Sequence, residues 1–161
     1  MTSPPSSVSD AFSVALRLLS RCDRSEAQLR NKLQDRGFSD DTISTTIERC
    51  YEYRYLDDRR YALNRTRALM RTGKGVGVRI LADLRQRGIA EDLARAVLEE
   101  VETEFSLADL FAQELSRRFP VFNYNSASDR ERRRVISYFQ RRGFPLSDIF
   151  TWLQQTSDPD R

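Results

Sequence analysis

LQDRGF at residues 33–38 indicates that this chain contains internal repeats, because closely similar hexapeptides occur as LRQRGI at 84–89 and FQRRGF at 139–144. In each copy an arginine precedes a glycine and a large apolar residue follows it. Recurrence at a spacing of about 50 residues is typical of tandem repeat architectures. The glycines Gly37, Gly88 and Gly143 therefore set the register for the rest of the sequence.

Apolar residues fall at helical offsets on both sides of each glycine. They lie four residues before it, eight residues before it and ten residues after it, which favours an amphipathic helix on each side. An arginine in the last turn followed by glycine is typical of a helix that ends in a left-handed C′ residue. The nine apolar positions are Leu33, Leu84 and Phe139; Leu29, Ile80 and Val135; and Ile47, Leu98 and Leu153.

Several helix starts are also marked in the sequence. Ser25 and Gln28 have the Ser-x-x-Gln spacing of a capping box. Ser39 or Asp40 can cap the helix after Gly37, and Pro145 suits an early position of the helix after Gly143. A further amphipathic helix is predicted ahead of each pair, near residues 10–21, 57–71 and 106–119.

These elements predict an all-α fold of three tandem three-helix modules in an elongated arrangement. We call the modules repeats 1, 2 and 3, with predicted bounds at residues 10–53, 54–104 and 105–157. Disordered tails are predicted at residues 1–9 and 158–161. NYNSAS at residues 123–128 has the composition of a loop.

Composition makes several functional classes improbable. The 161 residues include no histidine, so the usual general base and the commonest zinc ligand are both missing. Cys22 and Cys50 are expected to be reduced, packed thiols. No apolar run approaches the roughly 20 residues of a membrane helix, and MTSPPSSVSD at the start lacks the pattern of a signal peptide. We therefore expect a soluble, cytoplasmic protein.

The formal net charge of +3 conceals a strong segregation of charges. Residues 59–87 carry nine basic side chains against one acid, whereas residues 91–104 carry six acids against one arginine. Residues 130–142 carry six arginines against one acid. Arginine forms planar, bidentate contacts with carboxylates and phosphates. The segregation favours an acidic partner, but solvated helix faces joined by ion pairs would give the same pattern.

The adjacent acids Asp57 and Asp58 could form a metal site or start a helix. Neighbouring helix residues point about 100° apart, and no further carboxylates converge on this pair in the sequence, which disfavours a divalent metal. With Asp57 as N-cap, Leu56 and Tyr61 take the two positions of a hydrophobic staple, and Asp58 faces the positive end of the helix dipole. We predict that all four residues are structural, and we predict no catalytic residue, metal or cofactor.

Two other motifs do not fit their context. TGKGVGVR at residues 72–79 lacks the spacing of a phosphate-binding loop and follows a helix, so it indicates a helix-to-helix turn that could lie against a partner's backbone. The glycine-linked helix pairs resemble helix-turn-helix DNA readers, but the second helices begin with acids instead of groove-reading side chains. Aromatic residues lie mostly at core offsets, so base stacking is not indicated.

Basic side chains are predicted to line two helices at helical spacing. Two such stripes on separate modules suggest binding along an extended, acidic partner. The predicted partner- or DNA-contacting residues are Arg60, Arg67 and Arg71 on residues 57–71, Lys74 and Arg79 in the turn that follows, and Arg130, Arg134 and Arg141 on residues 129–142.

Four stretches carry a further signal: RSEAQLRNKLQDRGF at 24–38, YLDDRRYA at 55–62, TGKG at 72–75 and the I-x-x-x-L-x-x-R-G-I run at 80–89. Together they resemble the RecX family of recombinase regulators, with similarity over roughly residues 11–157. The resemblance implies three tandem three-helix modules, no catalytic activity, and binding to filaments of the RecA recombinase on single-stranded DNA. Such binding would limit filament growth, strand exchange, ATP hydrolysis and coprotease action during recombination, DNA repair and the SOS response.

From these observations we expect a monomer that binds the RecA filament, with single-stranded DNA as a second candidate ligand and no membrane partner. The main alternative function is a stand-alone helical protein that binds single-stranded nucleic acid, and a less favoured one is a magnesium-dependent nuclease that would use Asp57 and Asp58.

Overall fold

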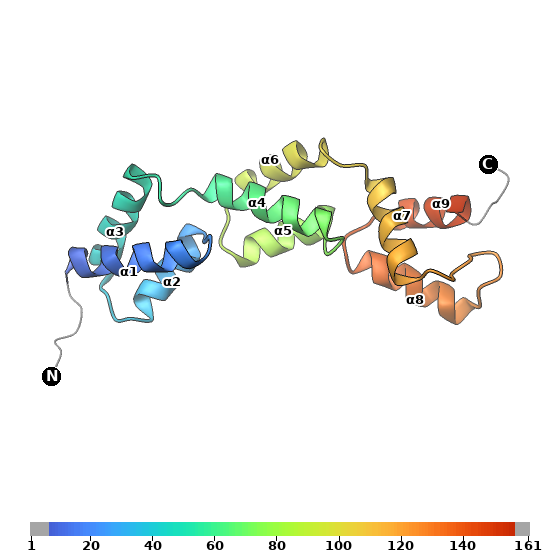
Figure 1. Ribbon diagram of the computed structural model, residues 1–161, viewed down its shortest axis with the longest axis horizontal. Helices are drawn as coiled ribbons and strands as arrows, with labels where there is room; N and C mark the ends of the chain where they lie inside the picture. The colour runs from blue at the N-terminus through green and yellow to red at the C-terminus, as the bar shows by residue number, and fades with distance from the viewer. Residues whose placement is uncertain (1–6, 157–161) are drawn as a thin grey trace. The chain divides into compact units, whose positions relative to one another are not determined.

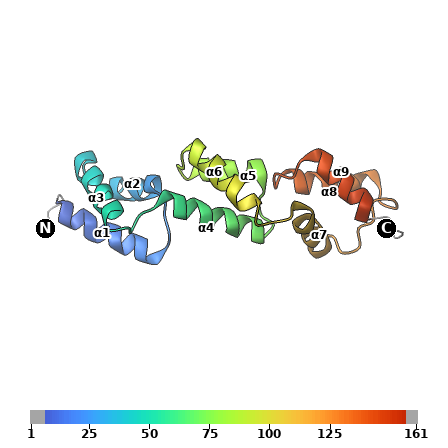
Figure 2. The same cartoon turned by 90° about the horizontal axis from the view of Figure 1, so that it is seen from above.

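The computed structural model describes residues 7–156, which form nine α-helices and no strand (Figures 1 and 2). The all-α prediction is confirmed. The helices are α1 (Val8–Arg21), α2 (Glu26–Gln34), α3 (Asp40–Glu52), α4 (Asp58–Arg71), α5 (Gly77–Gln86), α6 (Glu91–Glu102), α7 (Leu107–Arg118), α8 (Asp129–Gln140) and α9 (Leu146–Thr156). None of the helices within residues 7–156 is long and apolar enough to cross a membrane.

The ends of the described chain differ from the prediction at one point. Helix α1 begins at Val8, because the Ser7 hydroxyl accepts a hydrogen bond from the Asp10 N–H at 3.1 Å and caps the helix. The predicted tail therefore does not extend to residues 7–9. The rest of that tail, residues 1–6, and the predicted tail at 158–161 lie outside the described residues.

The glycine register is confirmed by burial and by backbone angles. All nine apolar positions that it predicts are buried, with exposed fractions of at most 8%. Gly37, Gly88 and Gly143 have φ of +83°, +78° and +95°, values that favour glycine because it lacks a Cβ. Each glycine thus ends one helix in the left-handed conformation and turns the chain toward the next helix.

Helix caps follow the sequence in most places. The predicted capping box at Ser25 and Gln28 is present, and Ser39 rather than Asp40 caps α3. Pro145 lies one residue before α9, where its carbonyl accepts a hydrogen bond from the Ile149 N–H at 3.0 Å. A second capping box, which sequence analysis missed, joins Ser128 to Glu131 at the start of α8.

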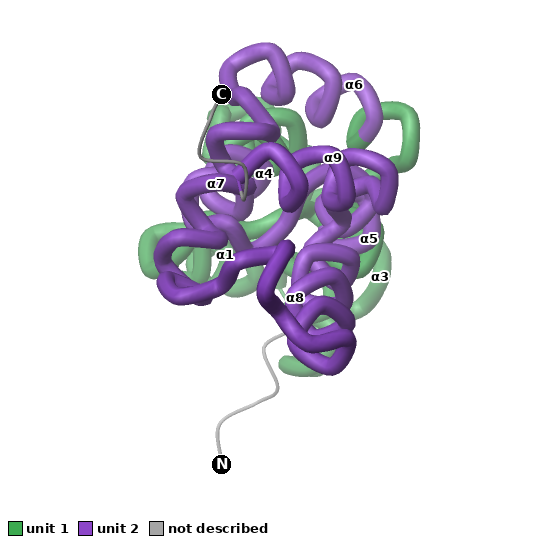
Figure 3. Tube along the Cα trace, turned by 90° about the vertical axis from the view of Figure 1, so that its right-hand side faces the viewer, with its two compact units in different colours: residues 1–64, 84–94 green, residues 65–83, 95–161 purple. Residues whose placement is uncertain are grey.

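Contacts divide the described chain into two compact units (Figure 3). Unit 1 contains residues 7–64 and 84–94, and unit 2 contains residues 65–83 and 95–156. This division differs from the repeats predicted from sequence, because repeat 2 contributes residues to both units. Each unit is described by itself below.

The core of unit 1 is aliphatic. Helix α3 packs against both α1 and α2, and side chains such as Leu29, Leu33 and Ile43 are almost completely buried in one cluster. Cys50 belongs to this cluster, but Cys22 is exposed. Both thiols are free, so the prediction of a packed thiol is right for Cys50 and wrong for Cys22, which follows the last residue of α1.

The core of unit 2 is aromatic at its C-terminal end. The rings of Phe111 and Phe139 lie 4.1 Å apart between centroids, and Phe144 contacts Phe139 at 5.4 Å. Trp152 closes the cluster at 5.2 Å from Phe111. These four side chains hold α7, α8 and α9 together. The turn between α8 and α9 lies beside residues 73–76 of the same unit.

In unit 1, the turn that contains Gly88 lies directly on the start of α2. The buried Ser25 hydroxyl donates to the Arg87 carbonyl at 2.5 Å. A Cβ atom added to Gly88 would lie 2.2 Å from the Cβ of Ala27. Glycine is therefore needed at position 88 for two reasons: the backbone has a positive φ, and it approaches α2 too closely for a Cβ atom.

In unit 2, the turn that contains Gly143 lies in the same way on the start of α5. The Val76 N–H donates to the Arg142 carbonyl at 2.8 Å. A Cβ atom on Gly143 would lie 2.1 Å from the Val76 carbonyl oxygen. Ser25 and Val76 each stand immediately before the second helix of a repeat, so both units contain the same joint between a helix start and an Arg-Gly turn.

The joint yields a prediction that compares the three glycines. Alanine at Gly37 meets nothing within 4 Å, so Gly37→Ala should cost only the left-handed strain of about 1–2 kcal/mol. Gly88→Ala and Gly143→Ala carry the same strain plus a collision, which should cost at least about 2 kcal/mol more. Urea unfolding of the three variants measures these differences. Equal losses for all three would show that the joints do not require glycine.

Candidate partner-binding surface

The first acid of the Asp57–Asp58 pair starts α4. The Asp57 carboxylate accepts a hydrogen bond from the Arg60 N–H at 2.9 Å. Leu56 and Tyr61, the predicted staple residues on either side, are both buried. This geometry agrees with Asp57 as N-cap of the helix that carries Arg60, Arg67 and Arg71.

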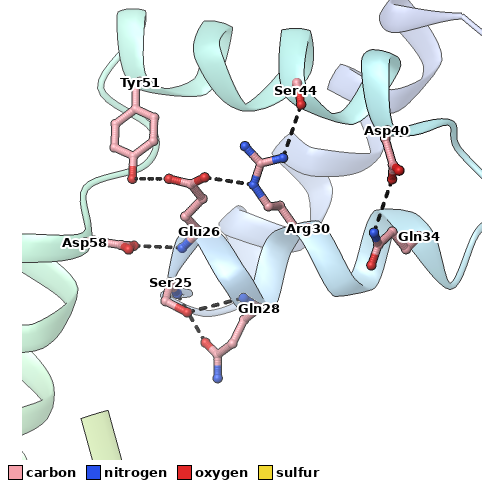
Figure 4. Close-up of polar contacts among 9 residues, drawn as sticks. All are labelled: Ser25, Glu26, Gln28, Arg30, Gln34, Asp40, Ser44, Tyr51 and Asp58. Carbon is pink, nitrogen blue, oxygen red and sulfur yellow. Dashed lines mark hydrogen bonds and ion pairs between the residues drawn. The ribbon is translucent and has the colours of Figure 1, made fainter. Parts of the chain in front are cut away.

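The second acid has a role that sequence analysis missed. Asp58 accepts a hydrogen bond from the Glu26 N–H at 2.7 Å, so it caps the start of α2 as well as opening its own helix (Figure 4). Glu26 in turn accepts from the Tyr51 hydroxyl at 2.9 Å and from Arg30 Nε at 2.8 Å. Burial raises the pKa of the Asp58 carboxyl, and the bond from Glu26 N–H opposes that rise. Within residues 7–156, no group of three or more acids and cysteines is placed to hold a metal ion.

Several arginines of the basic segments are paired with acids of the same unit. Arg65 forms a bidentate ion pair with Asp83, with N–O distances of 2.8 and 2.9 Å. Arg67 does the same with Glu104 at 2.6 to 3.1 Å, and its hydrogen bonds lower the pKa of the Glu104 carboxyl. Arg67 was predicted to contact a partner, but its guanidinium is already occupied.

The other predicted contact residues are placed differently. Arg134 lies over the ring of Phe119, 5.9 Å from its centroid. The remaining six are exposed and form no ion pair within the described part of the chain: Arg60, Arg71, Lys74, Arg79, Arg130 and Arg141. Arg60 belongs to unit 1, whereas the other predicted contact residues belong to unit 2.

The joint of unit 2 brings four of these cations around one turn. Arg142 Nε donates to the Gly73 carbonyl at 3.1 Å, and the Arg142 carbonyl accepts from Val76. The turn at residues 72–76 is thereby fixed against the end of α8. We call Arg71, Lys74, Arg79 and Arg141 the basic turn surface. Arg130 lies about 16 Å away along α8, so the structure does not gather all the predicted contacts into one patch.

A buried acid, Glu114 of α7, holds this turn in place. Its carboxylate accepts a hydrogen bond from the Tyr138 hydroxyl. It also accepts two hydrogen bonds from the Arg117 guanidinium, at 2.8 and 2.9 Å. Arg142 lies 3.9 Å from the same carboxylate and stacks 3.6 Å above the centroid of the Tyr138 ring. Glu114 is only 5% exposed. In the sequence, Glu114 lies near Phe111 and Leu115 on the apolar face of α7, and this is the one signal from which its burial could have been predicted.

Comparison with known proteins gives a consistent result. Residues 11–50 match the model of the first three-helix domain of RecX, and residues 57–98 match the model of the second three-helix domain. The regulatory protein RecX of Syntrophotalea carbinolica is 44% identical over 146 residues, which cover 91% of this chain and 95% of the relative. The regulatory protein RecX of Haemophilus influenzae is 34% identical, covering 87% and 90%.

Solved structures are similar in fold. The crystal structure of RecX from Lactobacillus salivarius has a TM-score of 0.72 at 24% identity and covers 92% of this chain and 95% of its own. A second crystal structure, of a regulatory protein RecX, has a TM-score of 0.71 at 26% identity, covering 92% of this chain and 73% of its own.

The cap of α4 gives a stability prediction. Asp57→Ala removes the acceptor of the Arg60 N–H, so the free energy of unfolding should fall by about 0.5–2 kcal/mol. Asp57→Asn keeps an acceptor and serves as the control. Urea unfolding followed by far-UV circular dichroism measures both. A full loss of helix signal in Asp57→Ala without denaturant would contradict a role limited to capping.

Tyr138 gives a prediction about pH. Burial and the hydrogen bond to Glu114 raise the pKa of the Tyr138 hydroxyl in the folded chain. As pH rises past about 10, the unfolded chain therefore releases this proton first and the free energy of unfolding falls. Tyr138→Phe lacks this effect, so the wild type should lose more stability than the variant between pH 9 and 11 in urea titrations. Equal losses would mean that the buried hydroxyl titrates normally.

Proposed function

Since this chain belongs to the RecX family of regulatory proteins, we propose that it is a non-enzymatic regulator that binds filaments of the RecA recombinase on single-stranded DNA. By binding, it limits filament growth, strand exchange, ATP hydrolysis and coprotease activity. The protein acts in the cytoplasm as a monomer. The observation that carries this proposal is the basic turn surface, whose four exposed cations form no ion pair within the described part of the chain.

The internal pairing of the arginines supports the choice of contact residues. Arg65 and Arg67 already bind carboxylates of the same unit, and a partner would have to break these pairs before it could bind there. Arg71, Lys74 and Arg79 need no such exchange. Carboxylates of the recombinase and phosphates of the DNA that it coats are both suitable counterparts, because a guanidinium binds either one in bidentate fashion.

The rigidity of the turn also supports the proposal. Arg142 fixes the Gly73 and Val76 backbone from one side, and Glu114 fixes Arg142 and Tyr138 from the other. Cations on a turn held in this way lose little freedom when a partner binds, which reduces the entropic cost of association.

A stand-alone binder of single-stranded nucleic acid is the second candidate, favoured by the same unpaired cations. It predicts tight binding to bare single strands that weakens steeply as salt concentration rises. Regulation through the recombinase predicts instead that filaments are bound much more tightly than bare DNA at the same salt concentration. Sedimentation of the protein with each ligand separates the two functions.

The proposed function gives a prediction about two cations. Arg71→Glu combined with Lys74→Glu reverses the charge of the basic turn surface and should weaken inhibition of RecA-dependent ATP hydrolysis at least tenfold. The far-UV circular dichroism spectrum should remain that of the wild type, because neither side chain forms an internal ion pair. The measurement is the protein concentration that halves ATP hydrolysis on single-stranded DNA.

A matched control separates this site from a general effect of charge. Lys32→Glu combined with Arg36→Glu makes the same change on two exposed residues of unit 1 and should leave inhibition within about twofold of the wild type. If the Arg71/Lys74 variant inhibits as strongly as the wild type, the basic turn surface is not the contact. If both variants lose inhibition equally, only overall charge matters.

A further inference from the structure

The segment between α3 and α4 exposes aromatic side chains that the proposed function does not use. Five aromatic residues within residues 7–156 are buried, whereas Tyr53 is 57% exposed and Tyr55 is 48% exposed. Their ring centroids lie 6.1 Å apart, and both rings contact Phe12 of α1, at 5.9 and 6.4 Å. The prediction that aromatic residues occupy core positions therefore fails here, within unit 1.

Tyr55 borders a groove. Its lining combines the apolar side chains of Leu16 and Leu19 of α1 and the ring of Tyr55 with the cations Arg54 and Arg60. We call this feature the tyrosine groove, lined by Leu16, Leu19, Ser20, Arg54, Tyr55 and Arg60. Neither arginine forms an ion pair within residues 7–156, so the groove combines an apolar wall with two uncompensated cations.

Arg54 is held in an unusual conformation. Its φ of +58° is the only positive φ of a non-glycine residue among residues 7–156. Left-handed backbone costs a residue with a Cβ about 1–2 kcal/mol. The turn is nevertheless closed by hydrogen bonds from the Tyr55 and Leu56 N–H groups to the Cys50 carbonyl, at 2.9 and 3.2 Å. A strained arginine where glycine would fit without cost points to a role for the side chain.

The groove suits protein better than nucleic acid. Base stacking needs a free ring face for each base, whereas Phe12, Tyr53 and Tyr55 cover part of one another. Two cations also neutralise few phosphates, so they would add little affinity for a nucleic-acid strand. Tyrosine and arginine are, in contrast, among the residues that most often dominate the binding energy of protein interfaces.

We propose that the tyrosine groove binds an acidic protein segment that carries a large apolar side chain. The apolar side chain lies against Leu16, Leu19 and Tyr55, and carboxylates pair with Arg54 and Arg60. Resting on the proposed function, the inference identifies this segment as part of the recombinase in its filament. Unit 1 thus provides a contact of its own, separate from the basic turn surface of unit 2.

Two double variants test the groove by different routes. Tyr53→Ser with Tyr55→Ser removes the aromatic wall, and Arg54→Asn with Arg60→Gln removes the cations while asparagine tolerates the left-handed turn. Each should weaken binding to RecA filaments on single-stranded DNA at least tenfold. Binding to bare oligothymidylate should change less than twofold. Fluorescence anisotropy with labelled protein measures both ligands, and circular dichroism checks the fold.

Control variants match the changes in kind. Val121→Ser removes an apolar side chain that is 95% exposed in unit 2, and Lys32→Gln with Arg36→Gln removes two cations elsewhere in unit 1; both should bind filaments as the wild type does. Filament binding that survives in both groove variants overturns this inference alone. A parallel loss of oligothymidylate binding assigns the groove to nucleic acid and overturns it as well. A wild-type protein that does not bind filaments overturns the proposed function together with this inference.

Discussion

A carbonyl group just before a glycine is the point on which the arrangement within each unit depends. The Arg87 carbonyl accepts from Ser25 and the Arg142 carbonyl accepts from Val76, and in both cases the next residue approaches a helix start too closely for any side chain. A buried carbonyl without a donor is costly, so the turn cannot shift without losing its bond. In unit 2, this constraint fixes the position of the turn that carries the basic turn surface.

Arginine residues have two different roles in this chain. Those close to an acid of the same unit stabilise the fold, and those without such a pair are available to bind a partner. Arg65 and Arg67 find carboxylates within their own unit and serve the fold. Arg71 and Arg60 form no ion pair among the described residues, although the charge of Arg71 helps to lower the pKa of the Glu104 carboxyl, so both guanidinium groups remain available to a partner. Because a guanidinium can form the same bidentate pair with a carboxylate of its own chain or of a partner, composition alone cannot separate the two groups.

The sequence predicted correctly those features that depend on interactions between residues close together in the chain. The C′ glycines, the Ser25 capping box and the cap at Asp57 all depend on residues within four positions of one another, and the nine core positions follow from helical periodicity. It failed where a partner lies far along the chain. Nothing near Asp58 points to Glu26, and nothing near Arg67 points to Glu104. The exposed tyrosines lie where α3 ends, and periodicity says nothing about residues beyond the last helical turn.

The joints also bear on the order in which the chain folds. Each links residues far apart in sequence, 62 positions for Ser25 and Arg87 and 69 for Gly73 and Arg142, and the helix start always precedes the turn that covers it. During synthesis, the bond at a helix start can therefore form only after the next Arg-Gly turn has emerged, whereas contacts within a repeat can form earlier. The turn at Gly37 has no earlier repeat to cover, so only the joints at Gly88 and Gly143 impose this order.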